Sequence, residues 1–155
     1  MYIKDTMRIS VAVAVLLIAG EMYAQAATPS FLLHVDVSPT SAKTGSEFLM
    51  LVALTNNRPE EMVMTVCLGI DVQDNFAIQV RDSRGNSVPG PKRLSCTQTA
   101  PVGVLAGETM KFQGDLSRMF DLSRPDRYKI QVERQDAYTN KPVKSNVSYI
   151  TVTSR

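Results

Sequence analysis

The sequence predicts an all-β domain in which two antiparallel sheets pack face to face. Apolar and polar residues alternate in several short segments, which is the period of strands with one buried and one exposed face. Turn-forming residues separate these segments, and no segment has the length and period of a long helix. About seven or eight such strands are ordinarily accommodated by two packed sheets with Greek-key connections.

The predicted strands follow one another along the chain. Residues 48–54 are apolar in both phases and are expected to form a central strand. Residues 89–103 contain three prolines and two glycines and are predicted to be a long connection. Residues 117–122 have helical spacing but are too few for more than one helical turn. The inward-facing residues elsewhere are expected to be Phe31, Leu33, Val35 and Val37; Met62, Met64, Val66 and Leu68; Phe76, Ile78 and Val80; Met110, Phe112, Gly114 and Leu116; and, after a bulge near Tyr149, Ile150 and Val152.

Residues 115–132 contain the corner around which the fold is expected to be organised. Tyr128 opens a strand in which every second residue is apolar, and residues 124–127 (RPDR) have turn chemistry because proline presets φ. A tyrosine in this position is typical of the tyrosine corner of Greek-key sandwiches, where its hydroxyl binds upstream backbone. We therefore predict an immunoglobulin-like sandwich with a structural corner formed by Asp121, Pro125 and Tyr128.

The beginning of the chain has the pattern of a secretory signal peptide. A basic start, an apolar run and the small-x-small sequence AQA follow one another in residues 1–26. The apolar run is shorter than the roughly 20 residues that span a bilayer, so we expect cleavage after Ala26, with an uncleaved anchor as the alternative. The predicted organisation is a signal peptide followed by one sandwich domain at residues 27–155, located in the periplasm or secreted, without a stable membrane anchor.

Cys67 and Cys96 are the two cysteines of the chain. In an oxidising compartment an even number of cysteines favours a disulfide, and two separate buried thiols are the alternative. The bridge would stabilise the fold by about 3–4 kcal/mol in the chain-entropy model. It would tie the long connection that carries Cys96 to the strand that ends near Cys67.

The second half of the chain contains a series of short motifs. LAGET, DLS, FDLSRP, YKIQV and KSN occur in this order within residues 105–153. The series resembles a mostly uncharacterised family of short exported bacterial proteins with one immunoglobulin-like domain. Some members are similar in fold to an intracellular proteinase inhibitor or to fibronectin type III-like sandwiches. Asp126 stands where the family usually has glycine, which favours a type I turn. The resemblance implies a fold far more than an activity.

Catalytic and metal chemistry is not indicated by the sequence. The single histidine, His34, is predicted on an outward strand face, which is more typical of a surface histidine than of the base that a nucleophile needs. A zinc site would need three or four ligands. Asp71, Asp74 and Asn75 would suit calcium, but an ordinary turn is the favoured interpretation. We expect no enzymatic activity, no cofactor and no metal site.

The sequence favours a non-enzymatic exported domain that binds another envelope or extracellular protein. A net charge of +2 with scattered basic residues argues against a nucleic-acid partner. The alternatives are a protease inhibitor, suggested by the resemblance, and a carbohydrate-binding module, which the lack of tryptophan disfavours. The candidate partner surface comprises Lys92, Arg93, Arg118, Arg124 and Arg127.

Overall fold

The computed structural model describes residues 28–68, 72–90 and 96–155. These residues form a mostly β structure in which all strand pairs but one short parallel pair are antiparallel, in agreement with the all-β class that the sequence predicts. The predicted signal peptide, Asp71, and Lys92 and Arg93 lie outside the described residues. Within the described part of the chain, no helix combines the length and apolar character needed to cross a membrane.

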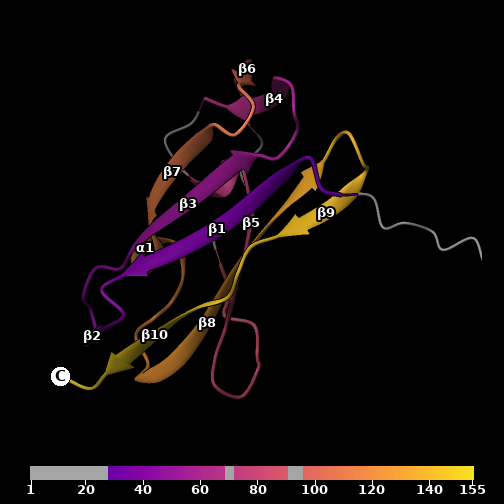
Figure 1. The fold of residues 1–155 in the computed structure, drawn as a ribbon. Helices are drawn as coiled ribbons and strands as arrows, with labels where there is room; N and C mark the ends of the chain where they lie inside the picture. Colours follow the sequence, from indigo (N-terminus) through magenta and orange to yellow (C-terminus); the bar gives the residue numbers. More distant parts are fainter. Residues whose placement is uncertain (1–27, 69–71, 91–95) are drawn as a thin grey trace, which may run out of the picture.

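Two larger sheets and a two-stranded ribbon make up the fold (Figure 1). The three-stranded sheet has the order β1 (Phe31–Ser38), β3 (Leu49–Asn56) and β7 (Thr109–Asp115). The five-stranded sheet has the order β2 (Ser41–Lys43), β10 (Ser148–Thr153), β8 (Asp126–Asp136) and β5 (Ala77–Arg81), with β9 (Lys141–Lys144) also pairing with β8. The ribbon pairs β4 (Met62–Cys67) with β6 (Thr99–Val104), and the helical segments are η1 (Val72–Asp74) and α1 (Leu116–Met119).

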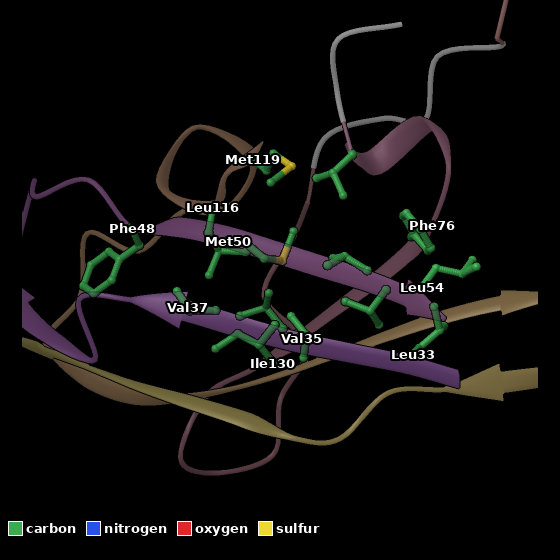
Figure 2. Packing of buried hydrophobic residues seen from close by; sticks show 14 of the residues in the cluster. Leu33, Val35, Val37, Phe48, Met50, Leu54, Phe76, Leu116, Met119 and Ile130 are labelled. Carbon is green, nitrogen blue, oxygen red and sulfur yellow. The ribbon is translucent and has the colours of Figure 1, made fainter. Parts of the chain in front are cut away.

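The inner faces of the two larger sheets share one apolar layer (Figure 2). Buried and exposed residues alternate along the whole of β1, so Val35 and Val37 point inward. Val52 of β3 and Ile130 of β8 are fully or almost fully buried in the same layer. Burying a side chain of this size stabilises the fold by about 1.5–3 kcal/mol, which makes this layer the main source of cohesion.

The ribbon corrects one prediction about the long connection. Residues 99–104 form β6 and pair with β4, so only the preceding part of residues 89–103 remains a connection. Pro101 is tolerated in β6 because this strand is at an edge, where the missing N–H breaks no ladder on its free side. β4 ends at Cys67, and therefore Leu68, predicted to point inward, is 57% exposed.

The last strand is divided, and the predicted bulge near Tyr149 is misplaced. β9 and β10 both pair with β8, and residues 145–147 interrupt the ladder between them. The Ser145 hydroxyl accepts the N–H of Val132 at 2.9 Å, while the Ser145 N–H donates to the carbonyl of the same residue at 2.8 Å. The side chain of Ser145 thus replaces part of the ladder at the break.

Asn56 stabilises the bend at the end of β3, where the chain leads from β3 into β4 and, alongside, from β6 into β7. Its side chain is buried, and its amide nitrogen donates to the carbonyls of Glu60 at 2.9 Å and Val104 at 2.8 Å. Its amide oxygen accepts the N–H of Arg58 at 2.8 Å. These bonds satisfy backbone groups that the bend removes from the ladder.

Side chains cap the free edge of β1. Asn146 accepts the N–H of Val35 at 2.7 Å and donates to the Val35 carbonyl at 3.0 Å. Ser30 lies just before β1, and its N–H donates to the carboxylate of the fully buried Asp136 at 2.8 Å. Capping of this kind protects a strand edge from pairing with other chains.

Asp136 makes the stability of the fold dependent on acid. Burial raises the pKa of its carboxyl, but hydrogen bonds from the N–H groups of Ser30 and Tyr138 and from Thr139 outweigh burial and hold the pKa below its ordinary value. The ionised carboxylate therefore stabilises the fold above the unfolded pKa of about 3.9. This stabilisation is lost as the pH falls through the lower pKa of the folded state.

We expect Asp136→Asn to weaken the acid dependence of folding. The free energy of unfolding, measured by urea denaturation at about pH 7 and about pH 3, should fall less with acid in this variant than in the wild type. Asp36→Asn, a change at an exposed position of β1, is the matched control and should keep the wild-type dependence. An unaltered pH dependence in Asp136→Asn would contradict this role.

Candidate functional site

Tyr128 forms the upstream bond that the sequence predicts. The side chain is buried at the beginning of β8, and its hydroxyl donates to the Arg124 carbonyl at 2.8 Å. Burial, with the nearby Asp126 carboxylate, raises the pKa of Tyr128, so the phenol remains a hydrogen-bond donor. Pro125 lies between the two bonded residues, and the bond therefore closes the loop that leads into β8.

A cleft of about 620 Å³ lies beside this corner. The carboxylates of Asp82 and Asp121, which line it, accept hydrogen bonds from residues of their own turns. Asp82 accepts from the side chain and N–H of Asn86, and Asp121 accepts the N–H of Ser123 at 3.1 Å. The hydrogen bonds from Asn86 lower the pKa of Asp82, and those from the side chain and the N–H of Ser123 lower the pKa of Asp121. Among the described residues, no group of three histidine, cysteine or acidic side chains could hold a metal ion. The geometry is that of a structural corner.

We expect Tyr128→Phe to lower the free energy of unfolding by about 0.5–1.5 kcal/mol, because it removes one partly buried hydrogen bond from the corner. Tyr149→Phe is the control, since the Tyr149 side chain is 46% exposed. Chemical denaturation of the three proteins measures the difference. Equal stability of Tyr128→Phe and wild type would show that the hydroxyl is not structural.

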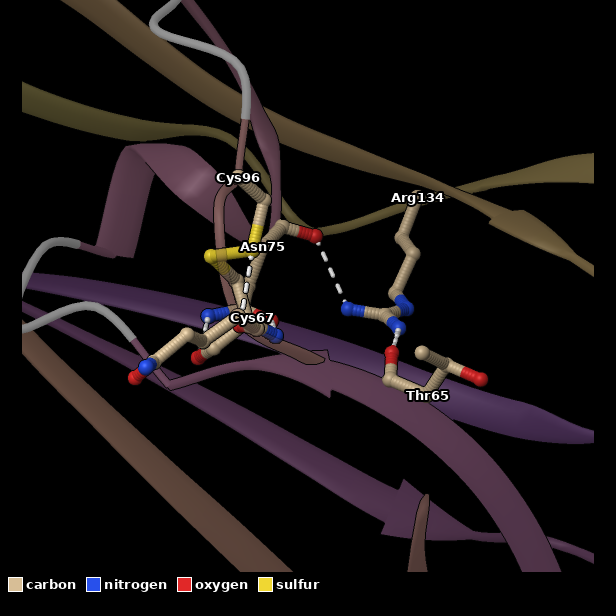
Figure 3. Close-up of a disulfide and its surroundings, with 6 residues drawn as sticks. Thr65, Cys67, Asn75, Cys96 and Arg134 are labelled. Carbon is tan, nitrogen blue, oxygen red and sulfur yellow. Dashed lines mark hydrogen bonds between the residues drawn. A yellow bond between two sulfur atoms is a disulfide. The ribbon is translucent and has the colours of Figure 1, made fainter. Parts of the chain in front are cut away.

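The disulfide between Cys67 and Cys96 is confirmed (Figure 3). The two Cα atoms lie 5.9 Å apart, and the bridge joins the end of β4 to the segment before β6. The Asn75 side chain accepts the N–H of Cys67 at 2.8 Å and donates to the Cys67 carbonyl at 3.2 Å. Asn75, considered above as a calcium ligand with Asp71 and Asp74, thus binds the end of β4 as part of a structural turn.

Arg134 fastens the ribbon to the five-stranded sheet. Its guanidinium donates to the Asn75 carbonyl at 2.9 Å and to the Thr65 carbonyl at 2.6 Å (Figure 3). It also lies over the Phe76 ring, 5.6 Å from the centroid. Burial lowers the pKa of Arg134. A cavity of about 410 Å³ lies against this side chain and the disulfide.

Tyr138 completes the attachment of β4. Its hydroxyl accepts the N–H of Val63 at 3.0 Å and donates to the Val63 carbonyl at 3.2 Å. Side chains therefore bind the free edge of β4 at Val63, Thr65 and Cys67. Sequence reasoning missed this arrangement, although a signal exists: Arg134 continues the inward phase of β8, where a charged residue needs buried partners.

Removal of the disulfide should lower the free energy of unfolding by about 3–4 kcal/mol, because the unfolded chain gains the freedom of an open loop. We expect this loss on reduction of the wild type and in the double variant Cys67→Ala, Cys96→Ala. Urea denaturation with and without dithiothreitol measures it, and the double variant, which reductant should leave unchanged, is the control. If reduction left the free energy of unfolding of the wild type unchanged, the disulfide would not stabilise the fold.

The three described arginines of the predicted partner surface have different environments. Arg118 of α1 pairs with Asp115 at 3.0 Å, and its side chain is 83% exposed. Arg124 is exposed and supplies the carbonyl that Tyr128 binds. Arg127 of β8 stacks on the Tyr149 ring, with 4.3 Å between the guanidinium carbon and the ring centroid. Of these three arginines, Arg127 is therefore the one that stacks on an aromatic ring.

Arg127 and Tyr149 belong to the outer face of the five-stranded sheet. In register, Lys129 of β8 lies opposite both Tyr149 of β10 and Arg81 of β5, so these three side chains form a row across the strands. Directly opposed residues of antiparallel strands point to the same face. No described segment of the chain covers this row, because all of its residues are exposed.

Comparisons with known proteins give no family assignment. No protein-family model and no curated protein matches the chain. Among solved structures, an alkylpurine DNA glycosylase from Pseudomonas fluorescens is similar with a TM-score of 0.47 and 13% identity, over 82% of this chain and 31% of that chain. β-Glucosidases from Erythrobacter marinus (TM-score 0.46, 14% identity, 81% of this chain) and Listeria innocua (TM-score 0.45, 13% identity, 82% of this chain) follow. The chain spans 16% of each of these two enzymes.

Proposed function

We propose that the chain is an exported immunoglobulin-like domain that acts without catalysis, by binding another protein of the envelope or the extracellular space. The observation that carries this proposal is the outer face of the five-stranded sheet, where the exposed Tyr149 ring is stacked by Arg127. Tyrosine and arginine, with tryptophan, are enriched among the residues that contribute most of the binding energy of protein interfaces. Because Arg127 already stacks on the exposed Tyr149 ring, the two side chains need little rearrangement when a partner binds.

The strand order supports the immunoglobulin-like part of the proposal. β8 lies between β10 and β5, the short β2 pairs in parallel with β10, and a separate sheet of β1, β3 and β7 packs on the other side of the core. The bond from Tyr128 to the upstream backbone is a feature of such sandwiches. Fold alone does not carry a function, so the binding role rests on the exposed face.

Export is supported by two observations of different kinds. Residues 1–26 have the pattern of a signal peptide, and Cys67 and Cys96 form a disulfide, which persists in oxidising compartments.

A pull-down from envelope extract tests the proposal. We expect the immobilised wild type to recover a specific partner protein, and Tyr149→Ala to lose it, because an exposed aromatic anchor is removed. The control is Leu32→Ala on the outer face of the three-stranded sheet, where Leu32 is 51% exposed. Failure of the wild type to recover any specific protein would refute the binding role.

A further inference from the structure

Four cationic side chains gather on the outer face of the five-stranded sheet. They are Lys43, Arg81, Arg127 and Lys129, and all are exposed. Arg81 and Lys129 lie directly opposite each other on β5 and β8. Arg127 is two residues before Lys129 on the same face, and Lys43 lies opposite Thr153 at the other edge of the sheet. We call these four residues together with Tyr149 the basic face.

The charges of the basic face are not neutralised within the described residues. The ion pairs found there are Arg58 with Glu60, Arg118 with Asp115, and Lys144 with Glu133, and none includes a cation of the basic face. Arg81 donates to the Gly85 carbonyl at 3.0 Å, which leaves its charge uncompensated.

Within the described part of the chain, the acidic groups near the basic face form no ion pair with its cations. Glu133 shares the outward phase of β8, but it lies opposite Ala77 at the far end of the strand and pairs with Lys144 at 3.8 Å. Asp126 accepts the N–H groups of Ser83 and Arg127. Like charges directly opposite each other destabilise a sheet modestly, and an anionic group bound between Arg81 and Lys129 would relieve this repulsion.

We propose that the basic face binds an acidic segment of a partner protein, with the partner's carboxylates placed over Arg81, Arg127 and Lys129. This inference rests on the proposed function and names the chemistry of the partner. An arginine stacked on a ring keeps the edge of its guanidinium available, and that edge binds a carboxylate through two parallel hydrogen bonds.

The composition of the basic face favours a protein over other polyanions. It combines arginine and tyrosine, as protein interfaces do. Proteins that track nucleic acids instead line a long groove with several aromatic rings for base stacking, and this face has a single exposed ring on a chain of net charge +2. Opposite charge across an interface also speeds association and selects the partner.

Fluorescence anisotropy with labelled poly-L-glutamate tests the proposal. The purified wild type should bind the probe in about 10 mM salt and bind it at least about tenfold more weakly in about 150 mM salt, because screening acts on exposed charges. Arg81→Gln and Lys129→Gln should each weaken binding several-fold. The matched control, Lys111→Gln, removes an exposed lysine of β7 in the other sheet and should change binding less than about twofold.

Thermal unfolding separates loss of binding from loss of fold. Lys129→Gln should have a Tm equal to or above that of the wild type, since it removes the repulsion with Arg81. The proposal is overturned if the wild type does not bind poly-L-glutamate, or if Lys111→Gln loses as much affinity as Lys129→Gln. Tighter binding to heparin, to DNA or to anionic phospholipid vesicles than to poly-L-glutamate would likewise overturn it.

The pull-down distinguishes this inference from the proposed function. A partner that is recovered by the wild type and lost with the double variant Arg81→Gln, Lys129→Gln supports both. A partner recovered equally well by this double variant leaves the binding role intact and refutes the basic face as its site. Recovery of no specific partner by the wild type refutes the proposed function itself.

Discussion

The period of two along β8 is the constraint on which the rest of the structure depends. Burial of Tyr128, Ile130 and Val132 between the larger sheets forces Arg127 and Lys129 onto the opposite face. A register shift by one residue would exchange the two faces and bury the charges. The same alternation that builds the core therefore also places cations on the surface, and the exposed row follows from the packing.

The inward-facing residues of β8 change from apolar to charged where the strand leaves the apolar layer. Beyond Val132, the inward positions carry Arg134 and Asp136, and hydrogen bonds with backbone compensate both: two for Arg134 and three for Asp136. Arg134 attaches the ribbon and Asp136 fastens the segment before β1. A charged group buried without such partners would cost several kcal/mol. The second half of β8 thus joins the peripheral elements to the core by polar contacts in place of apolar ones.

The structural contacts and the proposed binding surface occupy different parts of the molecule. The Tyr128 corner, the Asn56 corner and the disulfide satisfy backbone groups or close loops, and their polar atoms are already engaged. The basic face has the opposite character, since its cations have no carboxylate partner among the described residues. Groups that are fully engaged stabilise the fold, whereas the cations of the basic face remain available to a ligand, and the proposed binding role rests on this contrast.

The sequence by itself determined the local features of this protein. Alternation identified β1, β4 and β8, the cysteine count indicated the disulfide, and turn chemistry located the Tyr128 corner, because each signal is contained in a few neighbouring residues or in composition. Only the tertiary structure decided the pairing of β6 with β4, the break at residues 145–147 and the attachment by Arg134. It also decided the basic face: Lys43, Arg81 and Lys129 are scattered along the chain, and strand pairing, which depends on contacts between distant residues, brings them onto one face.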